Sequence, residues 1–124
     1  MPGILLVDDA AFMRMLLRRI LTEAGLRVVG EAKDGSELLM KYPMTKPDLV
    51  LLDIVMPPIG DMRDGVQVLR RLISKYPDAK VIMCSSLGHQ GLVKEAIAAG
   101  AKDYIVKPFR AEKVVELASK YCPR

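Results

Sequence analysis

The sequence is poor in cysteine and in aromatic residues, and it contains no long apolar run. Two cysteines among 124 residues do not make a disulfide framework, and the apolar run VIMCSS around Cys84 predicts a buried free thiol. No apolar run approaches the ~18 residues that a membrane-spanning helix needs. The start, MPGILLVDD, lacks the basic stretch of a signal peptide. We therefore expect a cytoplasmic protein with no membrane partner.

The charge of the chain is basic but dispersed. The formal net charge is +4, and pairs such as Arg18-Arg19 and Arg70-Arg71 fall on faces of predicted helices that we expect to be solvated. Four tyrosines and two phenylalanines form no row of aromatics on which bases could stack. We therefore expect no direct nucleic-acid partner. The hydrophobic fraction of 51% and the length favour one globular domain, residues 1–124.

Five short, almost continuously apolar runs recur along the chain and alternate with stretches of helical period. Continuous apolar runs are typical of parallel strands that are covered on both faces. The alternation predicts an α/β fold: a flavodoxin-like (βα)₅ doubly wound parallel sheet with strand order 2-1-3-4-5 and right-handed crossovers. The predicted strands are Ile4 to Val7, Arg27 to Gly30, Leu49 to Leu52, Val81 to Cys84 and Tyr104 to Val106.

The helical stretches carry recognisable start and stop signals. In the first, residues 10–25, the spacing places Phe12, Leu16, Leu17, Ile20 and Ala24 on one apolar face. The second is expected to begin with Ser36 as N-cap and to close before Pro43. The others are predicted over residues 64–76, 90–99 and 110–121.

Polar residues follow four of the five predicted strands. Parallel sheets bind ligands at the carboxyl ends of their strands, so in the order 2-1-3-4-5 these side chains converge on one edge. They are Asp8 and Asp9 after the first strand, Asp53 after the third, Ser85 and Ser86 after the fourth, and Lys107 followed by Pro108 after the fifth.

Three aspartates at one edge repel one another. At about 4 Å and an effective dielectric near 20, each like-charged pair costs roughly 4 kcal/mol. A hard divalent cation offsets that repulsion, because carboxylate oxygens are the ligands that Mg²⁺ prefers, and Lys107 adds a further positive charge. For a single aspartate, a solvated loop residue is the simpler interpretation. The combination of Asp8, Asp9, Asp53, Ser85 and Lys107 predicts a Mg²⁺ (or Mn²⁺) site.

The segments LLVDDAAFMR, LVLLDIVMP, VIMCSS and AGAKDYIVKPF resemble the motifs of bacterial response-regulator receiver domains in order and spacing, over essentially the whole chain. The segments DDAAFMRM, CSSLGHQ and AGAKDYIVKPF most resemble those of stand-alone chemotaxis regulators of the CheY type. The resemblance implies a phosphoprotein of a two-component system that catalyses only its own phosphorylation and dephosphorylation.

The resemblance also implies roles at the metal site. Asp53 matches the phosphoryl acceptor, Asp9 the direct metal ligand, and Asp8 the acidic partner that acts through metal-bound water. The backbone carbonyl of Val55 matches the third protein ligand. The product would be an acyl phosphate, which hydrolyses spontaneously, so the signal erases itself.

Three further residues match the switch machinery of the family. Ser85 matches the hydroxyl that bonds a phosphoryl oxygen, Lys107 the lysine that pairs with the phosphoryl group, and Tyr104 the aromatic residue whose rotamer follows activation. Alone, Ser85 would be read as a helix cap and Tyr104 as a packing residue. The resemblance also makes Lys107-Pro108 a candidate cis bond.

The implied partners are a sensor histidine kinase, a downstream target such as the flagellar motor switch, and a phosphatase. Signalling would change the surface of the fourth helix, fifth strand and fifth helix. Alternatives are a receiver cut from a larger regulator, an aspartyl-phosphate phosphatase or phosphotransferase, and a nucleotide-binding module. Val55 stands where such phosphatases carry a second aspartate, and DDAAFM is acidic where a phosphate loop would be glycine-rich.

One segment departs from the family pattern. In MPPIGDMRDG, six residues, Pro58 to Arg63, stand where the family usually has two. A surface insertion of this kind costs little free energy, so a harmless loop is the simpler interpretation. The alternative hypothesis is that the insertion borders the acceptor and changes the dephosphorylation rate, with Asp61 approaching the metal.

Overall fold

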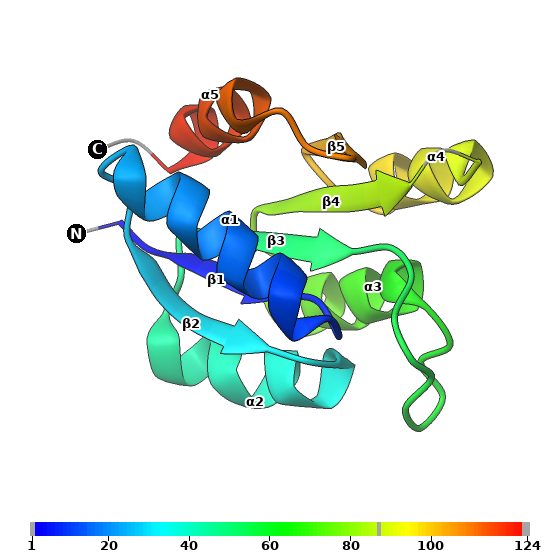
Figure 1. Ribbon diagram of the computed structural model, residues 1–124. Helices are drawn as coiled ribbons and strands as arrows, with labels where there is room; N and C mark the ends of the chain where they lie inside the picture. The colour runs from blue at the N-terminus through cyan, green and yellow to red at the C-terminus, as the bar shows by residue number, and fades with distance from the viewer. Residues whose placement is uncertain (1, 87, 123–124) are drawn as a thin grey trace.

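A computed structural model describes residues 2–86 and 88–122 of the chain. Within these residues, strands and helices alternate, and a single parallel sheet has the order β2-β1-β3-β4-β5, as predicted (Figure 1). The elements are β1 (Ile4–Val7), α1 (Ala11–Glu23), β2 (Val28–Ala32), α2 (Gly35–Thr45), β3 (Leu49–Asp53), α3 (Gly65–Lys75), β4 (Val81–Ser86), α4 (Gln90–Ala98), β5 (Asp103–Lys107) and α5 (Ala111–Tyr121).

Helices cover both faces of the sheet, which is why its central strands are apolar throughout. Helices α1 and α5 lie together on one face, and α2 and α3 lie on the other, with α4 beside the β4 end (Figure 1). Each face has its own hydrophobic cluster, with Leu21 and Leu117 in the first and Leu38 and Leu69 in the second. Every residue of β1 and β3 is buried, so these two strands form a fixed floor. In the described part of the chain, no helix is long and apolar enough to cross a membrane.

The packing of α1 corrects one prediction. Phe12 does not join the core: its side chain is 66% exposed, whereas Leu17 and Leu21 are buried. At 3.6 residues per turn, Phe12 lies roughly 140° around the helix from Leu17. The predicted apolar face was too wide, and only its part nearest the sheet and α5 is buried.

Both predicted boundaries of α2 were wrong. Asp34, not Ser36, is the N-cap, and its carboxylate accepts a hydrogen bond of 2.8 Å from the Glu37 N–H. The helix also continues through Pro43 as far as Thr45. A proline so near the end removes only one late hydrogen bond, and packing of Tyr42 against Tyr76, with ring centroids 4.7 Å apart, favours continuation.

Two smaller predictions, on Cys84 and on the Lys107-Pro108 bond, are confirmed. Cys84 is buried as a free thiol, and so is Cys122. The Lys107-Pro108 peptide bond is cis. Asp64 caps α3, accepting hydrogen bonds from the N–H groups of Val66 and Gln67 at 2.9 and 3.1 Å.

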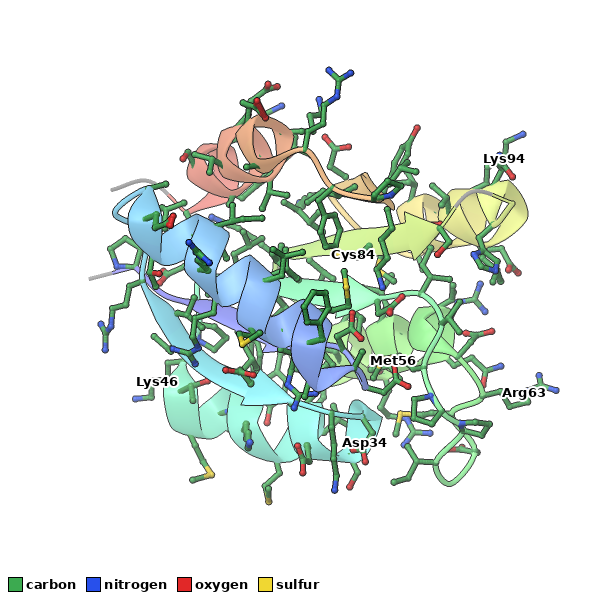
Figure 2. All side chains as sticks on the ribbon, in the orientation of Figure 1. Asp34, Lys46, Met56, Arg63, Cys84 and Lys94 are labelled. Carbon is green, nitrogen blue, oxygen red and sulfur yellow. The ribbon has the colours of Figure 1, made fainter. Side chains whose placement is uncertain are left out.

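The inserted segment forms an ordered hairpin between β3 and α3 (Figure 1). Ile59 and Met62 exchange two backbone hydrogen bonds of 2.9 and 3.0 Å, and Gly60 supplies the positive φ of the turn, +58°. Met62 is buried, whereas the side chain of Arg63 points away from the domain (Figure 2). We call residues 58–63 the inserted hairpin.

Helix α3 begins directly against the end of β3, which fixes the position of the last strand residue. The Gly65 N–H donates to the Ile54 carbonyl at 2.6 Å. A Cβ at position 65 would lie 2.7 Å from the Ile54 Cα, so only glycine permits this approach. The backbone that carries Asp53 is therefore clamped between β4 and the start of α3.

Candidate functional site

Three aspartates meet at the carboxyl edge of the sheet, as the sequence predicted. Asp8 follows β1, Asp9 comes next, and Asp53 is the last residue of β3. One carboxylate oxygen of each lies within 4.8 Å of the others. Asp8 and Asp53 are buried and Asp9 is exposed, so the cluster has an inner wall and an open side. We call these three residues the acidic cluster.

Lys107 enters the acidic cluster from the end of β5. Its Nζ lies 2.7 Å from Asp53 Oδ2 and 3.2 Å from Asp8 Oδ2, and its side chain is only 18% exposed. Strand β4 separates β5 from β3, so the lysine side chain spans the width of one strand. The predicted association of Lys107 with the aspartates is therefore confirmed.

Burial and neighbouring charges shift the pKa values of Asp53 and Lys107. Burial raises the pKa of Asp53 above the ordinary aspartate value, and the charge of Asp8 adds to this rise. The hydrogen bond and charge of Lys107 oppose it without reversing it. Burial lowers the pKa of Lys107, but its hydrogen bond to Asp53 and the two aspartate charges outweigh burial and raise it. Lys107 is therefore held in its cationic form.

Backbone N–H groups fix the orientation of the two buried carboxylates. The Ala10 N–H donates to Asp8 Oδ1 at 2.9 Å, and the Val55 N–H donates to Asp53 Oδ1 at 3.1 Å. The cluster carries three negative charges against the single positive charge of Lys107. One divalent cation balances the remainder, and carboxylate oxygens are the donors that a hard cation such as Mg²⁺ takes. The residues present therefore fit a divalent metal.

Unlike Lys107, the predicted switch residues Ser85 and Tyr104 show no hydrogen bond to the acidic cluster within the described residues. Ser85 is buried on β4, but its hydroxyl donates to the Ser86 carbonyl at 2.9 Å. Tyr104 lies on β5 with its side chain 43% exposed. Asp53 pairs in register with Cys84, so Ser85 stands one residue beyond the level of the acceptor candidate. A bond from Ser85 to a group on Asp53 requires its hydroxyl to rotate.

Asp61 does not approach the cluster, contrary to the hypothesis from the sequence. Both of its carboxylate oxygens accept from one guanidinium nitrogen of Arg71 on α3, at 2.7 and 2.8 Å. This ion pair holds the inserted hairpin against α3. The pKa of Asp61 is lowered, first by the hydrogen bond from Arg71 and then by its charge.

Sequence reasoning missed two residues beside the site. Arg14 on α1 donates from Nη1 to the backbone carbonyl of Asp8 at 2.6 Å, and from Nε to Glu31 of β2 at 2.9 Å. The apolar period of α1 placed Arg14 only on a polar flank. Its contact with Asp8 depends on how α1 crosses β1 and β2, which no local pattern reveals.

Cys84 beside Asp53 is not a reactive thiol. Burial, followed by the charge of Asp53, raises its pKa to about 12. The thiol is therefore neutral at physiological pH. This agrees with a packing role in the cluster on the α1 and α5 face.

The comparisons with known proteins agree with this fold and site. A family model for the response regulator receiver domain matches residues 4–119. Chemotaxis protein CheY of Thermotoga maritima is 50% identical over 117 residues, covering 94% of this chain and 94% of that protein. CheY of Listeria monocytogenes is 49% identical over 120 residues, covering 97% and 98%.

A solved structure of a CheY protein also matches this chain. The crystal structure of the CheX–CheY–BeF3–Mg²⁺ complex from Borrelia burgdorferi matches with a TM-score of 0.86 and 36% identity. The match covers 96% of this chain and 87% of that one. The chain belongs to the response-regulator receiver domain family. Within that family it is a CheY-like receiver, and its acidic cluster is consistent with a phosphoacceptor pocket.

Because the pKa of Asp53 is raised, ionisation of Asp53 destabilises the folded state. The folded pKa lies above the unfolded one, so Asp53 favours the folded state at low pH, and this contribution is lost as pH rises through the folded pKa. We expect Asp53→Asn, measured at pH 7 without divalent cation, to raise the melting temperature by a few degrees. The gain should shrink as the pH falls through the raised folded pKa and should vanish below the ordinary aspartate pKa.

Thermal unfolding from pH 3 to 8 checks this expectation, with Asp78→Asn at an exposed aspartate as the control. Addition of Mg²⁺ should stabilise the wild type more than Asp53→Asn and narrow the difference. The expectation is contradicted if Asp53→Asn is less stable than wild type at pH 7. It is also contradicted if the difference in melting temperature does not change with pH.

Proposed function

We propose that this receiver accepts a phosphoryl group on Asp53 from a sensor histidine kinase. The observation that carries the proposal is the cluster of Asp8, Asp9 and Asp53 around the ammonium group of Lys107. Asp53 is the last residue of the central strand β3, is oriented by the Val55 N–H, and lies closer to the Lys107 ammonium than Asp8 does, at 2.7 against 3.2 Å. The receiver domain in this proposal is the whole chain, residues 1–124.

A divalent cation, Mg²⁺ or Mn²⁺, is the proposed cofactor. Asp9 would bind it directly, Asp8 through a water molecule, and Asp53 and the Val55 carbonyl would complete the protein ligands. When bound, such a cation neutralises charge on the transferring phosphoryl oxygens. The acidic cluster supplies the hard oxygen donors that this ion requires.

In the proposed transfer, a carboxylate oxygen of Asp53 attacks the phosphorus of a phosphohistidine. The new O–P bond forms as the P–N bond breaks, and the histidine nitrogen keeps the electron pair. Lys107, already 2.7 Å from Asp53, is placed to pair with the phosphoryl oxygens as the carboxylate becomes an acyl phosphate. Hydrolysis of that acyl phosphate by water restores Asp53 and releases inorganic phosphate.

We infer that the phosphoryl group then biases the surface formed by α4, β5 and α5. The Ser85 hydroxyl would leave the Ser86 carbonyl and bond to a phosphoryl oxygen. Tyr104 is exposed on β5 and borders an apolar groove that Val93 and Ile97 of α4 also line. A change of its rotamer would reshape that groove. Contacts made only in the phosphorylated state are what such a switch needs.

The proposed partners are proteins. They are the kinase, a downstream target such as the flagellar motor switch, and a phosphatase, and the proposed location is the cytoplasm. Support comes from the chemotaxis relatives and from the Borrelia burgdorferi structure, in which a CheY protein is in complex with CheX.

Intact-mass analysis tests the acceptor assignment. After incubation with acetyl phosphate and Mg²⁺, we expect the mass to increase by one phosphoryl group, because Asp53 is the buried carboxylate that lies nearer to Lys107. The addition should be absent from Asp53→Asn and present in Asp78→Asn. Addition to Asp53→Asn at the wild-type level would overturn the assignment.

The effect of the inserted hairpin on the lifetime of the acyl phosphate is also measurable. The hairpin begins five residues after Asp53, so we expect removal of Pro58 to Asp61 to change the lifetime of the acyl phosphate by altering access to Asp53. Phosphate release after removal of the phosphodonor measures that lifetime. Arg71→Ala keeps all hairpin residues but removes the ion pair with Asp61, and should show a smaller change in the same direction. An unchanged lifetime in the deletion variant refutes the hypothesis.

A further inference from the structure

Arg14 connects the loop of the acidic cluster to the edge of the sheet. Its Nη1 donates to the Asp8 carbonyl at 2.6 Å, and its Nε donates to Glu31 Oε1 at 2.9 Å. Its side chain is 18% exposed. A guanidinium carries its donors in a rigid plane, so two bonds in two directions fix its position. The side chain thus links α1, the residue after β1, and β2.

Glu31 is a firm anchor for this link. Arg18 donates to its second oxygen, Oε2, at 2.8 Å, and Lys41 Nζ donates to its backbone carbonyl at 2.6 Å. Burial raises the pKa of Glu31, but the hydrogen bonds from Arg18 and Arg14 outweigh burial and hold it below the ordinary value. Glu31 therefore stays ionised and keeps Arg14 in place.

The segment that Arg14 holds is short, and Arg14 adds to the bonds that Asp8 makes with Ala10, Ala32 and Lys107. Asp8 and Asp9 lie between β1 and α1, and the N-cap residue Ala10 has no side-chain cap for the helix. The main-chain contact of Arg14 acts on this segment from outside the cluster. Partners that orient metal ligands in this way typically contribute 10- to 100-fold to metal affinity.

Charge alone predicts the opposite effect, because a nearby cation opposes the binding of another cation. Glu31 offsets that charge only in part, because Arg14 shares its single carboxylate with Arg18. The gain from orienting Asp8 and Asp9 must therefore exceed the repulsion that remains.

We propose that Arg14 is a positioning residue for the divalent cation. By bonding to both the Asp8 carbonyl and the Glu31 carboxylate, it sets the geometry of Asp8 and Asp9, and thereby the metal affinity. The inference rests on the proposed function, since it assumes that the acidic cluster binds Mg²⁺. It concerns a residue that touches neither the proposed metal nor the phosphoryl group.

Calorimetric titration with Mg²⁺ alone tests the inference. Arg14→Ala should weaken Mg²⁺ binding about 10-fold or more. Arg18→Ala is the matched control: it removes one bond to the same Glu31 carboxylate, from the same helix, without touching Asp8. It should leave the affinity within about twofold of wild type. Thermal unfolding without metal should show a loss for both variants, and the larger loss for Arg14→Ala, which also removes the bond to the Asp8 carbonyl.

Arg14→Lys separates orientation from charge and serves if Arg14→Ala fails to fold. It keeps the positive charge, but a single ammonium centre does not reproduce the two-directional fork, so it too should weaken Mg²⁺ binding. Wild-type or tighter affinity in the folded Arg14 variants overturns the inference, as does an equal loss in Arg18→Ala. A wild-type protein that binds no Mg²⁺ refutes the proposed function and this inference together.

Discussion

Mutual repulsion of three carboxylates at one edge of a parallel sheet is the constraint on which the site depends. Asp8, Asp9 and Asp53 bring oxygens within 4.8 Å of one another, and two of the three are buried. Lys107 offsets part of the charge, with its ammonium 2.7 Å from Asp53. Burial raises the pKa of Asp53, and the charge of Asp8 adds to this rise against the opposing hydrogen bond and charge of Lys107. A divalent cation supplies what is missing, and an incoming phosphoryl group meets a site already arranged for negative oxygens.

The scaffold prevents the carboxylates from moving apart. Strands β1 and β3 are buried along their whole length, and Gly65 brings the start of α3 against the backbone after Asp53. Arg14 ties the residue after β1 to β2 by linking the Asp8 carbonyl to Glu31. The two hydrophobic clusters thus supply the folding free energy that offsets repulsion among the aspartates. Such an exchange of stability for function is common.

The sequence predicts the sheet and the cluster because both depend on local patterns. Continuous apolar runs indicate parallel strands, and the residue after each strand must lie at the carboxyl edge. Phe12 and Pro43 were misjudged because burial of a helix face and persistence of a helix through proline depend on tertiary packing. The hairpin pairing of Ile59 with Met62 and the contact of Arg14 with Asp8 join residues through space, and no spacing rule encodes them.

The central claim is that the acidic cluster is a metal site that includes the acceptor, Asp53. Anomalous diffraction from crystals soaked in Mn²⁺, a heavier substitute for Mg²⁺, tests it most directly. The account predicts one dominant peak, bounded by Asp8, Asp9 and Asp53 and by the Val55 carbonyl, that disappears in Asp9→Asn. A peak elsewhere on the molecule, or an empty cluster at saturating Mn²⁺, would contradict the account.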